Sequence, residues 1–272
     1  MTGRKAVRVS GIGASVARRL DSAPRGLGRV HSVFERAVNV LGDDDRLLTF
    51  HGPGRLAAPF AIALSEPLPL AAFAPGAALE ATSAGLEIGG VFLDLRLAEV
   101  VDTAMTPRTD PGPLASAVGE SQGTACGSAL SSPRALDGRR HLLDGIARAD
   151  ARRFVDGARR LVGLGEGLTP AGDDFLVGAL AILHAFLPGF VLGHPLIAID
   201  LGAAARAGTT LVARDFLLHA LDGRFSQVVL ALVAAASELE ARRLLAELLT
   251  MGATSGADTA AGMRVALAAL AR

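Results

Sequence analysis

The hydrophobic pattern divides the chain into two parts with different periodicities. Between residues 30 and 95, apolar and polar residues alternate in short runs rich in β-branched side chains, as is typical of strands. Turn residues separate these runs, which favours an antiparallel sheet or small barrel over alternating βαβ units. The expected elements are a short helix over 12–20 and strands over 30–40, 46–50, 60–64, 78–82 and 86–95.

Beyond residue 135 apolar residues recur at helical spacing. The expected helices cover 136–149, 151–161, 173–187, 197–207, 209–221, 226–236, 238–250 and 258–271. Residues 107–133 are rich in Gly, Ser, Pro and Ala and lack a clear period, as is typical of a linker or flap. The sequence predicts an α+β protein with a β-rich domain over 1–115, a flexible linker or flap over 116–134 and a helical domain over 135–272.

Composition narrows the possible partners. The formal net charge is +0 and the 272 residues include no Trp or Tyr, so neither charge nor aromatic platforms indicate nucleic-acid binding. Residues 175–199 contain no Asp, Glu, Lys or Arg, but Pro188 and Gly189 interrupt this run before the roughly 20 residues that a membrane span needs. The N-terminus lacks the apolar core of a signal peptide. We expect a cytoplasmic protein without a nucleic-acid or membrane partner.

Single residue types limit the chemistry further. Lys5 is the only lysine, so an anion bound elsewhere must meet arginine, hydroxyls, backbone N–H groups or a metal. Cys126 is the only cysteine, which excludes an internal disulfide, and it has no local partner that suggests a role. The histidines show no His-x-x-x-His spacing. His51, in a loop after a strand, looks site-like, whereas His184 in an apolar helix is expected to be a core residue.

The glycine-rich segment over 163–178 is the strongest candidate for a site. It is preceded by a predicted helix and lacks a Gly-Lys pair, so it is neither a dinucleotide fingerprint nor a phosphate loop. Capping of the following helix would need only one acid, yet Asp173 and Asp174 are adjacent. Two carboxylates suit a metal such as Mg²⁺ or the N–H groups of a substrate. Thr169 and nearby backbone amides suit an anion.

Two further segments share this chemistry. Residues 252–258 also place an acid, Asp258, four residues after a threonine, Thr254, ahead of a predicted helix. An ordinary helix cap explains this segment alone, but two helix N-termini facing one cleft would bind a small anion. Thr210 and Arg214 share a helix face and suit a carboxylate or phosphate, unless the arginine pairs with a surface acid.

The core Gly-Leu-Thr-Pro-x-Gly-Asp-Asp at 167–174 closely resembles the signature loop of the AllH-like family. The resemblance extends to 30–34, 37–39, 208–210 and 254–258 and so covers most of the chain. Ala253 departs from the His or similar polar residue expected there, and the segment around Cys126 has no counterpart. The resemblance implies a subunit of oxamate carbamoyltransferase, which converts oxalurate and phosphate to oxamate and carbamoyl phosphate in allantoin and purine breakdown. It also implies two further subunit types and a functional link to carbamate kinase.

Site roles follow from the resemblance and the residue types together. Asp173 and Asp174 are the expected catalytic residues, holding ureido N–H groups or Mg²⁺. The expected substrate and anion ligands are Gly167, Thr169, Gly172, Thr210, Thr254, Ser255 and Asp258. No nucleophile is evident, which favours direct transfer or chemistry shared with another subunit. Two alternatives remain: a non-catalytic metabolite-binding or scaffold subunit, and a stand-alone, metal-assisted hydrolase of a small amide.

Overall fold

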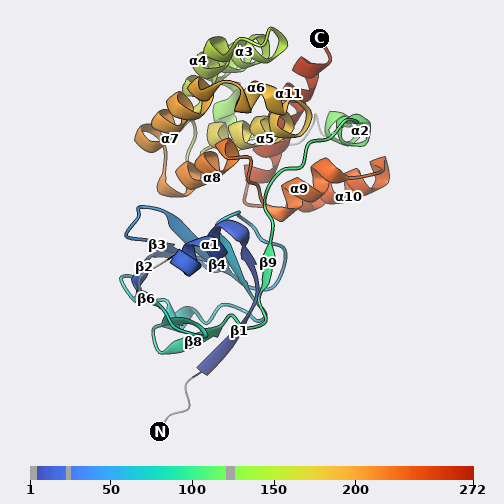
Figure 1. Cartoon of the computed structure of the whole chain (residues 1–272). Helices are drawn as coiled ribbons and strands as arrows, with labels where there is room; N and C mark the ends of the chain where they lie inside the picture. Colours follow the sequence, from blue (N-terminus) through green and yellow to red (C-terminus); the bar gives the residue numbers. More distant parts are fainter. Residues whose placement is uncertain (1–4, 23–25, 121–125) are drawn as a thin grey trace. The chain divides into compact units, whose positions relative to one another are not determined.

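The computed structural model describes residues 5–22, 26–120 and 126–272 and divides the chain into two compact units. The first unit ends at Thr103 and the second begins at Ala104, so the unit boundary lies ahead of the residue 115 expected from the sequence. The first unit is built from strands and the second from helices (Figure 1). The predicted α+β class is confirmed.

The N-terminal unit is a closed, mixed β-sheet. Its strands are β1 (Lys5–Gly13), β2 (Gly26–Val33), β3 (Ala37–Leu41), β4 (Leu47–His51), β5 (Ala61–Leu64), β6 (Ala78–Ala81), β7 (Gly85–Ile88), β8 (Val91–Asp94) and β9 (Glu99–Val101). Neighbouring strands follow the order β5-β4-β3-β2-β6-β7-β8-β1-β9, and an additional β5–β1 pairing closes the sheet into a barrel. Helix α1 (Ala14–Ser22) follows β1 directly, and a short 3₁₀ helix covers Leu70–Ala72.

The strands differ from the expected ones in two ways. Residues 30–40 and 86–95 are hairpins, not single strands: Phe34 N–H donates to Ala37 O at 2.8 Å in the first turn, and Gly89 and Gly90 have positive φ in the second. The sheet is also not purely antiparallel, because β1 pairs in parallel with β8 and β9, and β4 with β5. Both errors have one cause: alternation reveals a strand but not its turns or partners.

The C-terminal unit contains ten α-helices in its described residues. They are α2 (Gly112–Glu120), α3 (Pro133–Ala147), α4 (Ala151–Leu161), α5 (Ala171–Phe186), α6 (Pro188–Leu192), α7 (Gly202–Gly208), α8 (Leu211–Leu221), α9 (Gln227–Ala234), α10 (Glu238–Leu249) and α11 (Ser255–Leu270). A 3₁₀ helix covers Ser128–Ser131, and a π-helical turn, Ile197–Leu201, precedes α7. Within the described residues, no helix is long and apolar enough to cross a membrane.

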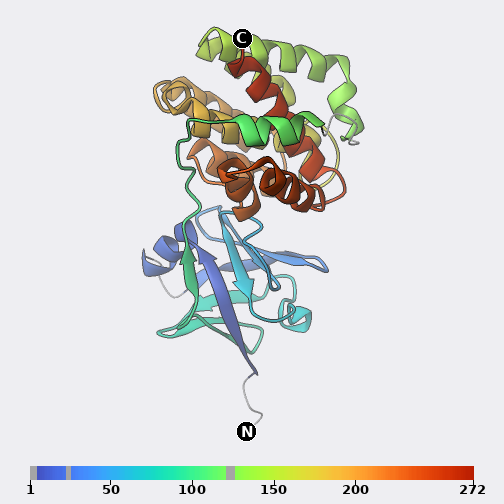
Figure 2. The same ribbon diagram turned by 90° about the vertical axis from the view of Figure 1, so that its right-hand side faces the viewer.

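Helix α2 lies in the segment expected to be a linker or flap. It buries Leu114, Ala117 and Val118 and packs against α10 (Figure 2). The helix is rich in alanine, glycine and serine and has only a short apolar face, so no helical periodicity could be recognised in its sequence. Residues 121–125 of the expected 116–134 flap lie outside the described residues.

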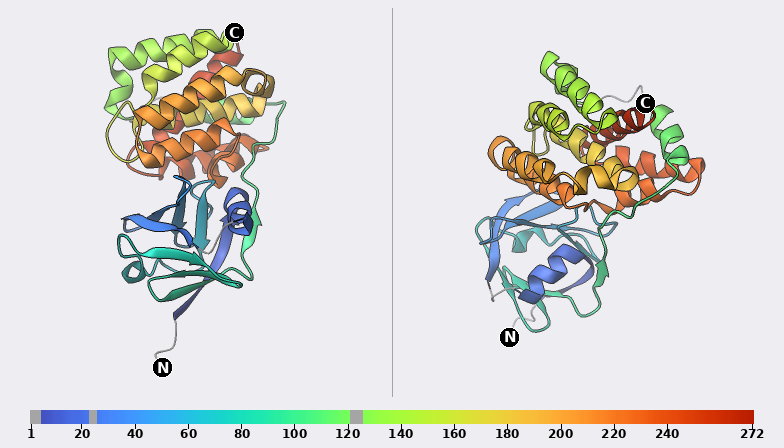
Figure 3. Two further views of the ribbon diagram at one scale, coloured as in Figure 1. Left: turned by 60° about the vertical axis from the view of Figure 1, so that its left-hand side comes forward. Right: turned by 45° about the horizontal axis from the view of Figure 1, so that its top comes forward.

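Helices α5 and α11 form the centre of the helical unit. Every residue of α5 except Phe186 is buried, and α3, α4 and α8 pack around the α5–α11 pair (Figure 3). Two glycines bring the helices into backbone contact. A Cβ atom on Gly178 would lie 2.0 Å from Thr259 O, and one on Gly262 would lie 1.9 Å from Phe175 O. Since Asp174 and Asp258 each lie one turn before these glycines, the contact places the two acids at paired helix starts.

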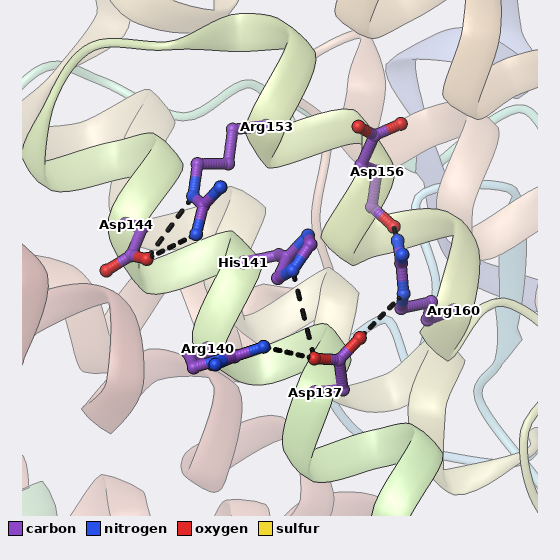
Figure 4. A network of polar contacts seen from close by, with 7 residues as sticks. All are labelled: Asp137, Arg140, His141, Asp144, Arg153, Asp156 and Arg160. Atoms are coloured by element: carbon purple, nitrogen blue, oxygen red, sulfur yellow. Dashed lines mark hydrogen bonds and ion pairs between the residues drawn. The ribbon is translucent and has the colours of Figure 1, made fainter.

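Helices α3 and α4 form a hairpin held by packing inside and ion pairs outside. Asp137 accepts from Arg140 at 2.6 Å and lies 2.9 Å from Arg160 Nε, and Asp144 accepts from Arg153 at 2.7 Å (Figure 4). These side chains are exposed or half-buried, so solvent screens each pair and its contribution to stability is small. The network therefore stabilises the hairpin surface and is separate from the acids of α5 and α11.

Candidate functional site

The two loops that the sequence singled out lie side by side. The hydroxyl of Thr169, in the loop before α5, is 2.8 Å from the hydroxyl of Ser255, the first residue of α11. The starts of α5 and α11 therefore meet, as the hypothesis of two facing helix N-termini requires.

The glycine loop over 163–170 has a backbone that side chains would oppose. Gly163 has a φ of 67° and Gly165 a φ of 124°, both in the region that favours glycine. Gly163 also packs so closely that a Cβ there would lie 1.9 Å from Gly208 O. The loop thus needs glycine for its own shape and for contact with the segment before α8.

Asp173 uses both of its carboxyl oxygens to hold the glycine loop in place. It is 1% exposed; its Oδ1 accepts the Gly163 N–H at 3.0 Å, and its Oδ2 accepts from Thr209 Oγ1 at 2.5 Å. Burial raises the pKa of Asp173 to about 6, although Thr209 and Gly163 act in the opposite direction. Because both carboxyl oxygens have internal partners, Asp173 ties the glycine loop to the α7–α8 connection.

Asp174 lies in a different environment. It is 8% exposed, and its Oδ2 is buried without a hydrogen-bond partner among the described residues. Burial raises the pKa of Asp174 to about 8; the hydroxyls of Ser255 and Thr169 counteract this, and the charges of Asp258 and Asp173 add to it. Neither Asp174 nor Asp173 caps α5, which has Pro170 at its N-cap and no side-chain capping bond.

Asp258 is the counterpart of Asp174 on α11. It is fully buried, and its Oδ1 accepts the Gly127 N–H at 2.8 Å, while Oδ2 has no hydrogen-bond partner in the described part of the chain. Burial raises the pKa of Asp258; the Gly127 N–H and then the Thr254 hydroxyl lower it. Two buried acids, one on each helix, thus each retain an unpartnered carboxyl oxygen.

Gly127 lies between the two helix starts. A Cβ atom at this position would be 2.7 Å from Ala171 Cβ on α5 and 3.3 Å from Asp258 Oδ2 on α11. The neighbouring Cys126 is half-buried, with its Sγ 3.6 Å from Ala257 O, and burial raises the pKa of its thiol. Cys126 therefore borders the site as a neutral thiol, which the sequence did not indicate.

Other expected ligands have structural partners instead. Thr210 caps α8 by accepting from Ala213 N at 3.2 Å, and it donates to Leu168 O at 2.5 Å. The N–H of Gly172 donates to Leu164 O at 2.8 Å. Arg214 is buried beside Asp215, with Nε 3.1 Å from Oδ1, so it does not share an anion site with Thr210. Gly167, with φ 89°, is exposed and has open space around it.

The two histidines that the sequence singled out, His51 and His184, each make contacts within their own unit. His51 ends β4, where its Nδ1 is 2.7 Å from Gly52 O and its Nε2 accepts from Ala57 N at 3.4 Å, so it closes the following loop. Burial lowers the pKa of His51. His184 is buried in α5 against Phe225, as expected for a core residue.

The Mg²⁺ expected at Asp173 and Asp174 does not fit these side chains. Both oxygens of Asp173 accept internal hydrogen bonds, so this carboxylate is already occupied. Among residues 5–22, 26–120 and 126–272, no three His, Cys, Asp or Glu side chains gather in a way that could hold a metal ion. The acids of α5 and α11 instead offer hydrogen bonds.

The arrangement suits a small ligand with both N–H and C=O groups. The unpartnered oxygens of Asp174 and Asp258 are buried, and the hydroxyls of Thr169, Thr254 and Ser255, at the starts of the same two helices, are half-buried. Buried polar atoms left without a partner are costly, so a ligand that hydrogen bonds to both oxygens would be stabilised there.

Family comparisons agree with this division of the chain. Residues 161–267 match the model described as oxamate carbamoyltransferase subunit AllH, and residues 5–100 match the AllH family N-terminal domain. The chain belongs to the AllH family. The first AllH match contains Asp173, Asp174 and Asp258, whereas Gly127 lies between the two matched ranges. No curated protein and no solved structure matches the chain.

Proposed function

We propose that this AllH-family chain contributes the carbamoyl-binding site of an oxamate carbamoyltransferase. The reaction is the phosphorolysis of oxalurate to oxamate and carbamoyl phosphate in allantoin and purine breakdown. The observation that carries the proposal is the pair of buried acids, Asp174 and Asp258, each with an oxygen that lacks a partner in the described structure. The family description, an oxamate carbamoyltransferase subunit, supplies the substrate.

The chemistry needs one bond exchange and one proton transfer. A phosphate oxygen attacks the terminal carbamoyl carbon of oxalurate, and the bond from that carbon to the inner nitrogen breaks. The proton lost by HPO₄²⁻ is balanced by the one gained by the departing oxamate nitrogen. A neutral carboxyl such as Asp174, with a pKa raised to about 8, can donate a hydrogen bond to the carbonyl next to that nitrogen near neutral pH and so stabilise the departing group.

Other groups have supporting roles in this proposal. Helix N-terminal N–H groups and the hydroxyls of Thr169 and Ser255 stabilise the oxyanion on the attacked carbon. Asp173 is a positioning residue because it fixes Gly163 and Thr209 and leaves no carboxyl oxygen for substrate.

The assembly is also part of the proposal. A subunit needs partners; we propose two further subunit types, a functional link to carbamate kinase and a cytoplasmic location. A purely scaffolding role is less favoured, because a scaffold gains nothing from two buried, unsatisfied acids. The alternative of a metal-assisted amide hydrolase predicts loss of activity with a chelator, whereas the proposed transfer at Asp174 and Asp258 is unaffected.

The test is oxamate-dependent consumption of carbamoyl phosphate, by the chain alone and with its partner subunits. Activity only in the mixture supports the subunit role. In the assembled enzyme, Asp258→Asn is expected to reduce turnover by about 100-fold or more, as loss of a charged hydrogen bond at the reacting group does. Asp137→Asn, on the separate α3–α4 surface, is the matched control. Absence of activity in a folded, assembled mixture overturns the substrate assignment.

A further inference from the structure

Asp258 lies close enough to Asp174 for its charge to raise the pKa of Asp174. Their helices touch at Gly178 and Gly262 one turn further on, and the carboxyls contact the hydroxyls of the adjacent residues Ser255 and Thr254. With both carboxyls buried, two charges at one site are unfavourable, so such a pair retains one proton.

The hydrogen bonds indicate which acid holds the proton. Asp258 accepts a backbone N–H from Gly127 at 2.8 Å, and an N–H donor favours the carboxylate form. Asp174 hydrogen bonds to the hydroxyls of Ser255 and Thr169, which can rotate to accept as well as donate. The raised pKa of Asp174 agrees with this order.

Other ionisable groups near Asp174 and Asp258 do not change which of the two acids holds the proton. Asp173, next along α5, adds to the rise in the pKa of Asp174. On the side of Asp258, Cys126 hydrogen bonds to that carboxyl and so favours its charged form. Arg264 from α11 and Arg139 from α3 act on the Cys126 thiol and lower its pKa.

We propose that Asp174, as a neutral acid, and Asp258, as a carboxylate, together select the amide end of a ligand over a carboxylate end. The O–H of Asp174 donates to the amide carbonyl, and Oδ2 of Asp258 accepts the amide N–H. A carboxylate in the same place has no N–H to give and meets the charge of Asp258. For its ligand, this inference rests on the proposed function: oxamate binds through its –CO–NH₂ group, with its carboxylate towards the Thr254 and Ser255 hydroxyls.

Calorimetric titration of the full chain, and of the assembled enzyme, with oxamate and oxalate at pH 7 tests this selection. Oxamate is expected to bind at least about tenfold more tightly than oxalate, which differs only in its second carboxylate. Asp174→Asn retains an N–H donor and is expected to keep oxamate affinity within about threefold, whereas Asp258→Asn loses about 10- to 100-fold.

Carboxyl ¹³C NMR provides a readout that needs no ligand. At pH 7 Asp174 is expected to be neutral and Asp258 ionised. Equal or tighter binding of oxalate, a greater loss in Asp174→Asn than in Asp258→Asn, the reverse ionisation, or no binding of either ligand in chain and complex overturns the inference. Absence of turnover with the oxamate preference intact instead overturns the proposed function and leaves this inference standing.

Discussion

At the scale of single residues, Asp173 and Asp174 show how adjacent side chains acquire different roles. Successive residues of a helix point about 100° apart. Asp173 therefore meets Gly163 and Thr209, while Asp174 meets the start of α11. The sequence drew attention to both acids and to Thr169, but it could not separate an acid with internal partners on both oxygens from an acid with an unpartnered oxygen. Nor could it indicate Gly127, whose contribution is a backbone N–H.

Asp173→Ala is expected to destabilise the fold. The change leaves the Gly163 N–H and the Thr209 hydroxyl without their acceptor in a buried place, which costs about 1–3 kcal/mol. Urea unfolding measures this. Asp174→Asn, which places a neutral side chain with an acceptor oxygen at the same position, is the comparison and is not expected to lower the free energy of unfolding. Equal losses in the two variants would contradict the assignment.

Stability is expected to fall as pH rises from 6 to 8. In the folded chain the pKa of Asp174 is raised from 3.8 to about 8, so the native state binds more protons than the unfolded state between these values. The stabilisation is complete below pH 3.8 and is lost as pH rises through the folded pKa, at up to about 1.4 kcal/mol per pH unit. Asp174→Asn should flatten the dependence measured by urea unfolding. Asp137→Asn should not, because the Arg140 hydrogen bond lowers the pKa of Asp137 and keeps it ionised throughout.

At the scale of elements, the position of the candidate site depends on two glycines that let helices α5 and α11 pack closely. Helix periodicity predicted α3–α5 and α8–α11 close to their observed bounds, but nothing in the pattern indicated that Gly178 and Gly262 join α5 to α11. A glycine inside a helix normally lowers the stability of that helix, so its local sequence suggests no packing role. The role becomes visible only once the partner helix is known. In the β-rich unit, the parallel partners of β1 were similarly hidden because they lie far away in the chain.

Gly262→Ala is expected to separate the helices and disturb the acids together. The new methyl group would lie 1.9 Å from Phe175 O, a backbone atom that cannot move aside alone, so a loss of about 1–3 kcal/mol or more is expected. Thermal unfolding with oxamate titration checks both effects. Gly119→Ala in α2 is the control, since its methyl group meets nothing within 4 Å and should be neutral or stabilising. A Gly262→Ala variant as stable as the control would refute the close contact.

At the scale of the whole molecule, each unit has its own hydrophobic core. One core joins the strands around Val38 and Phe50, and the other joins the helices around Phe154 and Phe175. The site residues from Gly127 to Asp258 all belong to the helical unit. Composition and periodicity predicted two domains because strands and helices have different periods. The boundary at Thr103 depends on contacts, which a Gly- and Pro-rich segment does not reveal.

A fragment over 104–272 is therefore expected to fold alone and to retain the ligand site. Circular dichroism should show a helical, cooperatively unfolding protein, and oxamate affinity should stay within about threefold of the full chain, because the hydrogen-bonding groups are unchanged. A fragment that is unfolded, or folded without oxamate affinity, would show that the β-rich unit completes the site.

We propose Asp174 and Asp258 as the site of carbamoyl transfer. Its most direct test compares oxamate-dependent carbamoyl phosphate consumption by assembled enzymes carrying wild-type chain, Asp258→Asn and Asp137→Asn. We expect a loss of about 100-fold or more for Asp258→Asn and turnover within about twofold of wild type for Asp137→Asn. Wild-type turnover in the folded Asp258→Asn enzyme would rule out this site.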